Sequence, residues 1–255
     1  MSLKTLMMDK IPNYNQLVIP YHALKAAYAA YKYDFPGRKM RVIGVTGTNG
    51  KTSTCFLIWK MLNAAGYKTG LMTTVAWGVD KLEEQVEHMT TVDVGVLNAR
   101  MQKIAETGAE FLVLEITSHA LVQHRTFGVP IEIAVMTNVT HEHLDYHRTF
   151  DNYRDAKRRL FKMAKFGVIN EDDKTWAYFA NDVKEYITYG VNSGMLRAKE
   201  VELQADGVQY QIEVDQTIRV ILNDAELNPE GSEKEKKKNK TTKIKIRTQI
   251  PGKFT

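Results

Sequence analysis

The stretch that decides the fold runs from residue 40 to residue 52 and reads MRVIGVTGTNGKT. Its first part, Met40 to Thr46, is apolar, rich in β-branched residues and as long as a typical strand. The glycine-rich residues that follow lead into a strongly apolar stretch, Ser53 to Ala65, which predicts a helix. A strand, a glycine-rich turn and a helix in this order are the setting of a phosphate-binding loop.

The loop contains the residue types that phosphate binding requires. Its glycines let backbone amides turn toward phosphate oxygens, and the start of the helix adds partial positive charge. Lys51 would reach the β- and γ-phosphates of a nucleotide, and the Thr52 hydroxyl would bind Mg²⁺. The strict pattern has glycine where this chain has Val45, so an ordinary glycine-rich turn is the alternative. We predict that the phosphates bind to Gly47, Thr48, Asn49, Gly50, Lys51 and Thr52.

Outward from this loop, strands and helices alternate along the chain. Further helices are predicted at Asn15–Tyr33, Val94–Thr107, Asp151–Ala164 and Lys174–Asn181, and further strands at Tyr67–Thr74, Glu110–Ile116, Ile131–Asn138, Phe166–Asn170 and Glu185–Tyr189. Such alternation indicates a mostly parallel sheet with helices on both faces. Because Ser53–Ala65 is apolar on nearly all sides, we expect that helix to be buried.

The pattern changes after Gly190. Short segments there alternate polar and apolar residues with a period of two, which is typical of antiparallel strands. They lie at Arg197–Leu203, Val208–Val214, Thr217–Leu222 and Lys243–Gln249, with a hairpin turn at Ala205–Gly207. The sequence therefore predicts an α/β fold of the phosphate-loop type, with a small antiparallel sheet at about residues 195–250. We expect a helical extension at 1–39 and one ATP-binding domain at 40–255.

Composition limits the class of protein. With 255 residues, 44% of them hydrophobic and 25% charged, the chain is that of an ordinary globular protein. A single cysteine excludes a disulfide framework, and no apolar run or leader suggests export, so we expect a cytoplasmic protein. The net charge of +5 comes from residues 233–247, which alone sum to +6. No aromatic residue is interleaved there for stacking on bases, which favours a solvated loop over a nucleic-acid site.

Polar residues follow the strand that ends near Ile116. Glu115 lies at its carboxyl end, where ligands bind in open α/β sheets, and a carboxylate there can bind a metal ion. Thr117 and Ser118 come next and are good helix N-caps, so a purely structural cluster is the alternative. Both interpretations can hold together.

Residues 140–147 read THEHLDYH, directly after another predicted strand. Three histidines and an aspartate in so short a segment could form a zinc site, and His141, His143 and Asp145 would share a side if extended. With a nucleotide loop nearby, one histidine close to a nucleotide-bound Mg²⁺ is the simpler hypothesis. His141 and His147 are then expected to be structural or to face a substrate.

Lys157 lies on the apolar face of its predicted helix, where a charged residue is not expected. It recurs at helical spacing with Tyr153, Leu160 and Phe161, whereas the other basic residues of this helix can reach water. A lysine there can extend its amine to solvent along the apolar surface. Otherwise it needs a partner or a chemical change, such as carbamylation, because an unpaired buried ammonium is costly. The pattern alone leaves these alternatives open.

Five motifs in order resemble one family. They read TGTNGKT, MTTVD, LEITSHALVQHR, TNVTHEHLDYH and YRDAKRRLF, and together they are similar to the central domain of Mur ligases, most of all the UDP-N-acetylmuramyl-tripeptide synthetases of the MurE type. The resemblance covers about residues 38–254. It implies an ATP- and Mg²⁺-dependent amide ligase of peptidoglycan synthesis. ATP would phosphorylate the D-Glu carboxylate of UDP-MurNAc-L-Ala-D-Glu, and the amine of a diamino acid would attack the acyl phosphate.

The resemblance also implies roles for single residues. Lys51, His143 and Lys157 would be catalytic, and Glu115, His143 and carbamylated Lys157 would bind a second Mg²⁺. The substrate-binding positions would be Thr90, Thr91, Thr117, Gln123 and Arg125. The chain departs from the family pattern at Val92, where the family has proline, at Thr117, where it has serine, and in the segment His141–Asp145, where Glu142 replaces aspartate.

Full-length relatives have an N-terminal UDP-binding domain and a C-terminal domain that binds the amino acid. Only about forty residues precede the phosphate loop here, too few for the first domain, and the sequence stops at Pro251–Thr255, where the family continues into the second, so we expect an incomplete enzyme that lacks both. The added residue, meso-diaminopimelate or L-lysine, stays open. We expect a monomer that binds neither nucleic acid nor a membrane. The alternatives are a non-catalytic nucleotide-binding module and a ligase like folylpolyglutamate synthetase.

Overall fold

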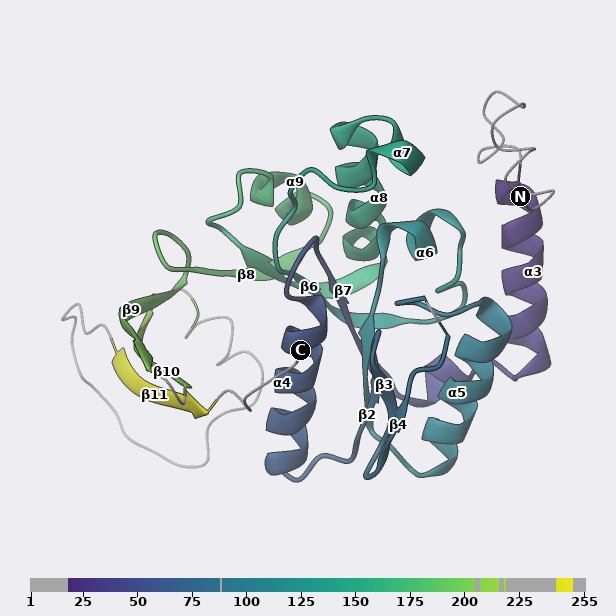
Figure 1. Ribbon diagram of the computed structural model, residues 1–255, viewed down its shortest axis with the longest axis horizontal. Coiled ribbons are helices and arrows are strands. Elements are labelled where there is room, and N and C mark those ends of the chain that lie inside the picture. Colours follow the sequence, from purple (N-terminus) through teal and green to yellow (C-terminus); the bar gives the residue numbers. More distant parts are fainter. Residues whose placement is uncertain (1–17, 88, 205–206, 216–217, 219–241, 250–255) are drawn as a thin grey trace. The chain divides into compact units, whose positions relative to one another are not determined.

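A computed structural model describes residues 18–87, 89–204, 207–215, 218 and 242–249 (Figure 1). The described residues form two compact units. The first contains the residues up to Gly167 together with Tyr178–Glu185, and the second contains Val168–Ala177 and the residues from Tyr186 onward. The predicted α/β class is confirmed: a mostly parallel sheet is flanked by helices, and antiparallel strands follow in the chain.

The sheet of the first unit has four parallel strands at its centre. They are β6 (Ile131–Met136), β1 (Arg41–Thr46), β5 (Phe111–Glu115) and β2 (Thr69–Met72), in that spatial order. An antiparallel pair, β3 (Ala76–Gly78) and β4 (Leu82–Glu84), extends the sheet beyond β2. Every residue of β5 is buried, as expected for a strand covered on both faces.

The pairing register of β1 determines which residues lie side by side at the edge formed by the carboxyl ends of the strands. Val45 pairs with Glu115 of β5, and Thr46 pairs with Met136 of β6. The residues that follow β1 therefore lie beside the ends of two other strands. In open α/β sheets this edge is where ligands bind.

Three long helices pack on the sheet. They are α4 (Lys51–Ala64), which contacts β1, β2 and β5, α8 (Phe150–Met163), which contacts β1 and β6, and α5 (Val94–Glu106), whose Ile104 side chain lies against Gly70 of β2. A fourth, α3 (Ile19–Lys32), packs on α5. The shorter helices are η1 (Pro36–Lys39), α6 (Ser118–Val122) and α7 (Leu144–His147). Along the chain after α8, β7 (Ala164–Asn170) and α9 (Trp176–Ala180) each contribute residues to both units.

The returning segment Tyr178–Glu185 completes the packing around α8. The ring of Phe179 meets that of Phe161 edge to face, with centroids 5.1 Å apart, and both side chains are fully buried. Arg158 Nε donates to Asp182 Oδ2 over 2.7 Å. An apolar contact and an ion pair thus hold this segment to the helix that precedes it by about twenty residues.

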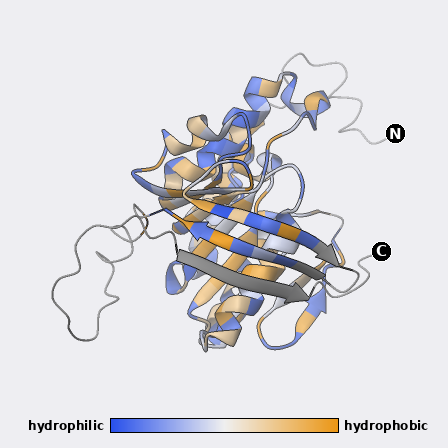
Figure 2. Ribbon diagram, turned by 90° about the vertical axis from the view of Figure 1, so that its left-hand side faces the viewer, coloured by the Kyte–Doolittle hydropathy of each residue, from blue (hydrophilic) through white to orange (hydrophobic). Residues whose placement is uncertain are grey.

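The second unit is built from β8 (Glu185–Gly190), β9 (Leu196–Gln204), β10 (Gly207–Val214) and β11 (Thr242–Gln249). A short parallel pairing joins β8 to β9, and antiparallel pairings join β9 to β10 and β10 to β11. Polar and apolar residues alternate along β9 and β10 (Figure 2). The Asp172 carboxylate accepts backbone N–H groups of Val191, Asn192 and Ser193, which fixes the turn between β8 and β9.

The predicted strands and long helices are confirmed within a few residues, apart from the predicted strand Thr217–Leu222. Only Ile218 of that strand is described, and its backbone is helical, with its N–H bonded to the Asp215 carbonyl over 3.2 Å. The rest of that strand, the residues Ala205 and Asp206 of the hairpin turn, the start of the first helix at Asn15 and the basic run before residue 242 lie outside the described residues. The sequence did not indicate β3, β4 or α7, and it indicated only the N-cap of α6, because each of these elements spans only three to five residues. Among the described helices, none has the length and apolar character needed to cross a membrane.

The prediction that α4 is buried is wrong. Cys55 is its only buried residue, while Leu57 is 50% exposed and Met61 is 70% exposed. Apolar residues on all sides of a helix indicate that other elements could pack against several of its faces. They do not show that other elements in the described part of the chain do so. Here α4 packs on the sheet with one face and leaves the other apolar side chains accessible.

This difference predicts unequal effects of one substitution at two helical leucines. Leu97 of α5 is completely buried, so Leu97→Ala should lower the free energy of unfolding by about 2–5 kcal/mol through loss of contacts and a residual cavity. Leu57→Ala on α4 should cost about 0.5 kcal/mol or less. Urea unfolding of both variants measures the difference. Equal costs at the two sites would show that α4 is covered after all.

Candidate functional site

The glycine-rich loop joins β1 to α4 at the carboxyl edge of the sheet. Gly47 comes directly after β1, and a Cβ atom there would lie 1.8 Å from Thr137 Oγ1, so no larger residue fits. Gly50 is the N-cap of α4 with a φ of 79°, a left-handed conformation that glycine adopts without strain. A Cβ atom on Gly50 would meet nothing within 4 Å, so open space lies in front of the helix N-terminus.

The residue pair at the end of β6 holds the loop in place. Asn138 accepts the Thr48 N–H with its backbone carbonyl over 2.8 Å and the Asn49 N–H with Oδ1 over 3.0 Å. Thr137 Oγ1 donates to the Asn49 carbonyl over 2.7 Å. These bonds fix the backbone of the loop before any ligand binds, which is the preorganisation that phosphate binding needs.

Lys51 and the first turn of α4 supply positive charge to the loop. Lys51 Nζ reaches back to the loop and donates to the Thr48 carbonyl over 2.6 Å. The first N–H groups of a helix have no partner within the helix and carry the positive end of its dipole. An anion in the open space beside Gly50 would therefore meet an ammonium group and backbone amides together.

Thr52 and Glu115 are in direct contact. Thr52 Oγ1 lies 2.9 Å from Glu115 Oε2 and 3.1 Å from Oε1. The same Oε2 accepts both the backbone N–H of Thr74 over 2.9 Å and its hydroxyl over 3.1 Å. A hydroxyl and a carboxylate side by side are ligands that Mg²⁺ prefers. Sequence reasoning missed Thr74, although it follows β2 and thus lies at the carboxyl end of the adjacent strand.

Lys157 does not extend to solvent. Its side chain is 2% exposed, and Nζ donates to the Gly47 carbonyl over 2.7 Å. Nζ also lies 4.4 Å from the centroid of the Tyr153 ring. Burial, and then the positive charge of Lys51, lowers the pKa of Lys157 to about 7, against the opposing effect of Glu142. The buried lysine therefore has a partner in the phosphate loop, and its amine is partly neutral near pH 7.

Tyr153 connects α8 to the loop and to the histidine segment. Its hydroxyl lies 3.1 Å from Thr48 Oγ1 and donates to Glu142 Oε2 over 3.3 Å. Burial raises the pKa of Tyr153 to about 12, so the hydroxyl keeps its proton. The sequence indicated Tyr153 only as a core residue, because an apolar stripe does not show what a tyrosine hydroxyl reaches.

The histidine segment is not extended. Residues from Leu144 onward form α7, and His143 precedes this helix with a φ of 54° and an imidazole that is 46% exposed. His141 stacks on Phe150 with ring centroids 4.7 Å apart. His147 is buried, and its Nε2 lies 2.9 Å from Ser118 Oγ. Burial lowers the pKa of His147 to about 4, so its ring is neutral at pH 7.

The residues implied as metal ligands form two groups. Thr52 and Glu115 lie together, whereas His143 and Lys157 each lie near Tyr153: the His143 ring centroid is 6.2 Å and Lys157 Nζ is 4.4 Å from the Tyr153 ring centroid. In the described part of the chain, no hydrogen bond or ion pair joins Glu115 to His143 or Lys157, and no group of three His, Cys, Asp or Glu residues could hold a metal. A zinc site of these histidines is thus not formed among the described residues.

Four of the five implied substrate residues are brought together. Thr91 Oγ1 donates to the Glu115 carbonyl and accepts the Thr117 N–H, each over 3.0 Å. Arg125 donates to the Thr91 carbonyl and, through Nη2, to Gln123 Oε1 over 2.7 Å. Thr117 is the N-cap of α6, which confirms the structural role that its position suggested. Thr90 adjoins this cluster in the chain and is half-buried.

Comparison with known proteins relates this geometry to one family. The profile of the Mur ligase middle domain matches residues 45–255. The chain is 36% identical to a UDP-N-acetylmuramoyl-L-alanyl-D-glutamate–2,6-diaminopimelate ligase of Clostridium acetobutylicum, over 73% of this chain and 39% of that protein. It is 38% identical to a UDP-N-acetylmuramyl-tripeptide synthetase of Roseiflexus sp., over 73% of this chain and 41% of that protein. The chain thus spans about two fifths of the length of these relatives.

Solved structures agree with this relationship. A UDP-N-acetylmuramoyl-L-alanyl-D-glutamate–2,6-diaminopimelate ligase superimposes with a TM-score of 0.63 at 32% identity, over 69% of this chain and 38% of that chain. E. coli FolC in complex with DHPP and ADP gives a TM-score of 0.56 at 19% identity, over 73% of this chain and 50% of that chain. At that identity the second likeness shows the fold alone.

The lowered pKa of Lys157 predicts how stability depends on pH. The folded pKa of about 7 lies below the ordinary 10.5, so the unfolded chain binds this proton more tightly. Relative to a Lys157→Met variant, the protein should gain stability as pH rises from about 7 toward 10.5, by up to about 1.4 kcal/mol per pH unit. Below pH 7 the difference should be constant.

Urea unfolding across this pH range measures the effect, in buffer free of Mg²⁺ and CO₂. Lys162→Met on the exposed side of α8 is the matched control, and the gap between it and the parent should hardly change with pH. A constant gap for Lys157→Met above pH 7 would contradict the assignment.

Proposed function

Because this chain belongs to the Mur ligase family through its middle domain, we propose that it is the ATP-activating part of a MurE-type ligase of peptidoglycan precursor synthesis. The proposed reaction joins a diamino acid to the D-Glu carboxylate of UDP-MurNAc-L-Ala-D-Glu. The observation that carries the proposal is the contact of Thr52 with Glu115, beside a loop whose backbone is already bound to β6. The names of the relatives supply the substrate class.

In this proposal the loop binds the phosphates of ATP. Lys51 Nζ exchanges the Thr48 carbonyl for phosphate oxygens, and the first amides of α4 donate from the other side. The Tyr153 hydroxyl and Asn138 keep the loop in its binding conformation. These groups position the γ-phosphate for transfer to the substrate carboxylate, which makes that carboxylate an acyl phosphate open to attack by an amine.

The residues present fit Mg²⁺ at Thr52 and Glu115, where a hydroxyl and a carboxylate lie within 2.9 Å of each other. A second ion held by Glu115, His143 and carbamylated Lys157 would require the two groups of side chains to come together when the ligands bind, because no hydrogen bond or ion pair joins Glu115 to the other two in the described part of the chain. When bound, Mg²⁺ would neutralise charge on the phosphate oxygens. The neutral fraction of the Lys157 amine near pH 7 supports carbamylation, because only an uncharged amine attacks CO₂.

The cluster at Thr91, Thr117, Gln123 and Arg125 is the proposed binding site of the muramoyl peptide. Thr91 bonds to the backbone of Glu115, so the peptide site is joined directly to the proposed metal site. The Arg125 guanidinium can donate to carboxylate or carbonyl oxygens of the peptide. This arrangement would bring the D-Glu carboxylate to the edge where ATP binds.

Nucleotide binding provides a test of the phosphate site. Lys51→Ala should weaken binding of MgATP by about a hundredfold or more, because a charge-assisted contact to phosphate is lost within a preorganised loop. Lys60→Ala, on the exposed face of the same helix, is the matched control and should bind as the parent does. Isothermal titration calorimetry measures both. Equal affinity in the two variants would exclude Lys51 as a phosphate ligand.

The carbamate is tested by carbon-13 NMR with labelled bicarbonate. The parent should show one protein-bound carbamate resonance, and Lys157→Gln should lose it while Lys162→Gln keeps it. Magnesium should sharpen or shift the signal if the carbamate is a ligand. A resonance that survives in Lys157→Gln would place the modification elsewhere, and none in the parent would remove the second metal site from the proposal.

The ligase assignment is tested by supplying ATP, Mg²⁺, UDP-MurNAc-L-Ala-D-Glu and either diamino acid to the chain and to any longer natural polypeptide that contains it. Phosphate release that depends on both organic substrates supports the proposal. If the rate of ATP hydrolysis depends on neither organic substrate, in the chain and in every longer polypeptide that contains it, the result would instead indicate a nucleotide-binding module without ligase activity.

A further inference from the structure

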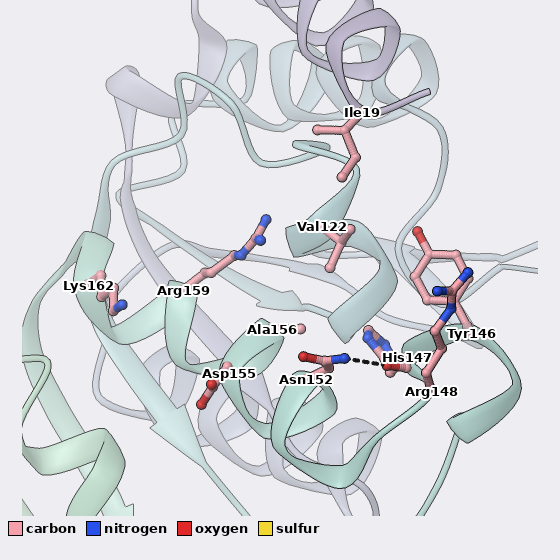
Figure 3. Close-up of a pocket in the computed structure, with 10 residues that line it drawn as sticks. All are labelled: Ile19, Val122, Tyr146, His147, Arg148, Asn152, Asp155, Ala156, Arg159 and Lys162. Carbon is pink, nitrogen blue, oxygen red and sulfur yellow. Dashed lines mark hydrogen bonds between the residues drawn. The ribbon is translucent and has the colours of Figure 1, made fainter. Parts of the chain in front are cut away.

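A separate cavity lies on the outer side of α8, away from the residues that face the phosphate loop. It has a volume of about 360 Å³, is open to solvent on one side, and is lined by residues of α6, α7, α8, the residue after α7 and the first residue of α3, all within the first unit (Figure 3). Its walls are formed by Ile19, Val122, Tyr146, His147, Arg148, Asn152, Asp155, Ala156, Arg159 and Lys162. This volume lies within the range of small-molecule sites.

The charges around this cavity are unbalanced. Arg148, Arg159 and Lys162 line it, and Asp155 is the one acidic residue among the lining side chains. The Asp155 carboxylate is already neutralised, since Oδ1 accepts from Arg154 Nε over 3.0 Å and from Arg158 Nη1 over 3.1 Å.

Two of the three basic groups have capacity for a ligand. In the described part of the chain, neither Arg159 nor Lys162 forms an ion pair. Arg159 Nη1 lies 3.5 Å from the Leu121 carbonyl, at the long limit of a hydrogen bond, and its side chain extends toward Val122. A guanidinium group in this state can give two parallel hydrogen bonds to a phosphate without losing a strong partner.

The remaining wall is apolar. Ile19, Val122 and Ala156 contribute aliphatic surface, and the Tyr146 ring stands at the far end of the cavity from Lys162. From these features we propose that the cavity binds a small phosphorylated molecule, with the phosphate at Arg159 and Lys162 and the organic part against the apolar wall. The volume suits an organic part about as large as a sugar or a nucleoside.

The proposed site is independent of the phosphate loop, because the two lie on different faces of one helix. Asn152, Asp155 and Arg159 line the cavity, whereas Tyr153 and Lys157 lie toward the loop. A molecule in the cavity would contact α6 and α8 together. It would thus bind behind the helix that carries Lys157 rather than compete with ATP.

The test uses Lys51→Ala as the background, so that binding at the phosphate loop is suppressed. Titration calorimetry with inorganic pyrophosphate and with uridine monophosphate should show saturable binding. Adding Arg159→Gln and Lys162→Gln should weaken it by about tenfold or more, since two charge-assisted contacts are removed. Adding Arg41→Gln and Lys165→Gln instead is the matched control, because these exposed residues carry the same total charge and both pair with Glu132.

The control pair should retain the affinity of the background. Backbone NMR shifts on adding either probe should be concentrated at Val122, Asn152 and Arg159 rather than at Gly50 and Lys51. Circular dichroism checks that each variant is folded, which is expected because the exchanged side chains are exposed. No saturable binding in the background, an equal loss in both variant pairs, or shifts confined to the phosphate loop would each overturn the proposal.

Discussion

The close approach of Gly47 to Thr137 is the constraint on which the rest of the site depends. Only a residue without a Cβ atom can pass Thr137 Oγ1 at this distance, so the loop after β1 lies directly against the end of β6. From that position Thr48 and Asn49 bond to Asn138. The Gly47 carbonyl then faces α8, where it accepts a hydrogen bond from Lys157 Nζ. The absence of a Cβ atom at Gly47 thus allows the end of β6, the phosphate loop and the buried Lys157 to pack together.

Much of the fold could be predicted because its signals are local. The strands β1, β5 and β6 are continuous apolar runs between clear breakers, and α8 has a regular apolar stripe. The hairpin β3–β4 was missed because strands of three residues have no measurable period. The exposure of α4 could not be predicted, because an apolar sequence reports the preference of the side chains and not whether another element covers them.

The residues of the candidate site also fall into those that could be predicted from the sequence and those that could not. Lys51, Thr52 and Glu115 follow from motif and strand position, and the structure places them at one edge. The contact of the Tyr153 hydroxyl could not be found, because it joins residues far apart in the sequence: the hydroxyl meets Thr48, which precedes it by 105 residues. The sequence raised the question of Lys157 correctly, but only its burial and its bond to Gly47 show that the amine is held inside.

The chain leaves the first unit after Gly167, returns at Tyr178 and leaves again after Glu185. Phe179 and Asp182 therefore reach α8 only after part of the second unit has been synthesised. During translation, the hydrophobic side of α8 at Phe161 must wait for this later segment before it is sealed from water. The first unit, although it is the first to leave the ribosome, therefore cannot be completed until the beginning of the second unit has also emerged.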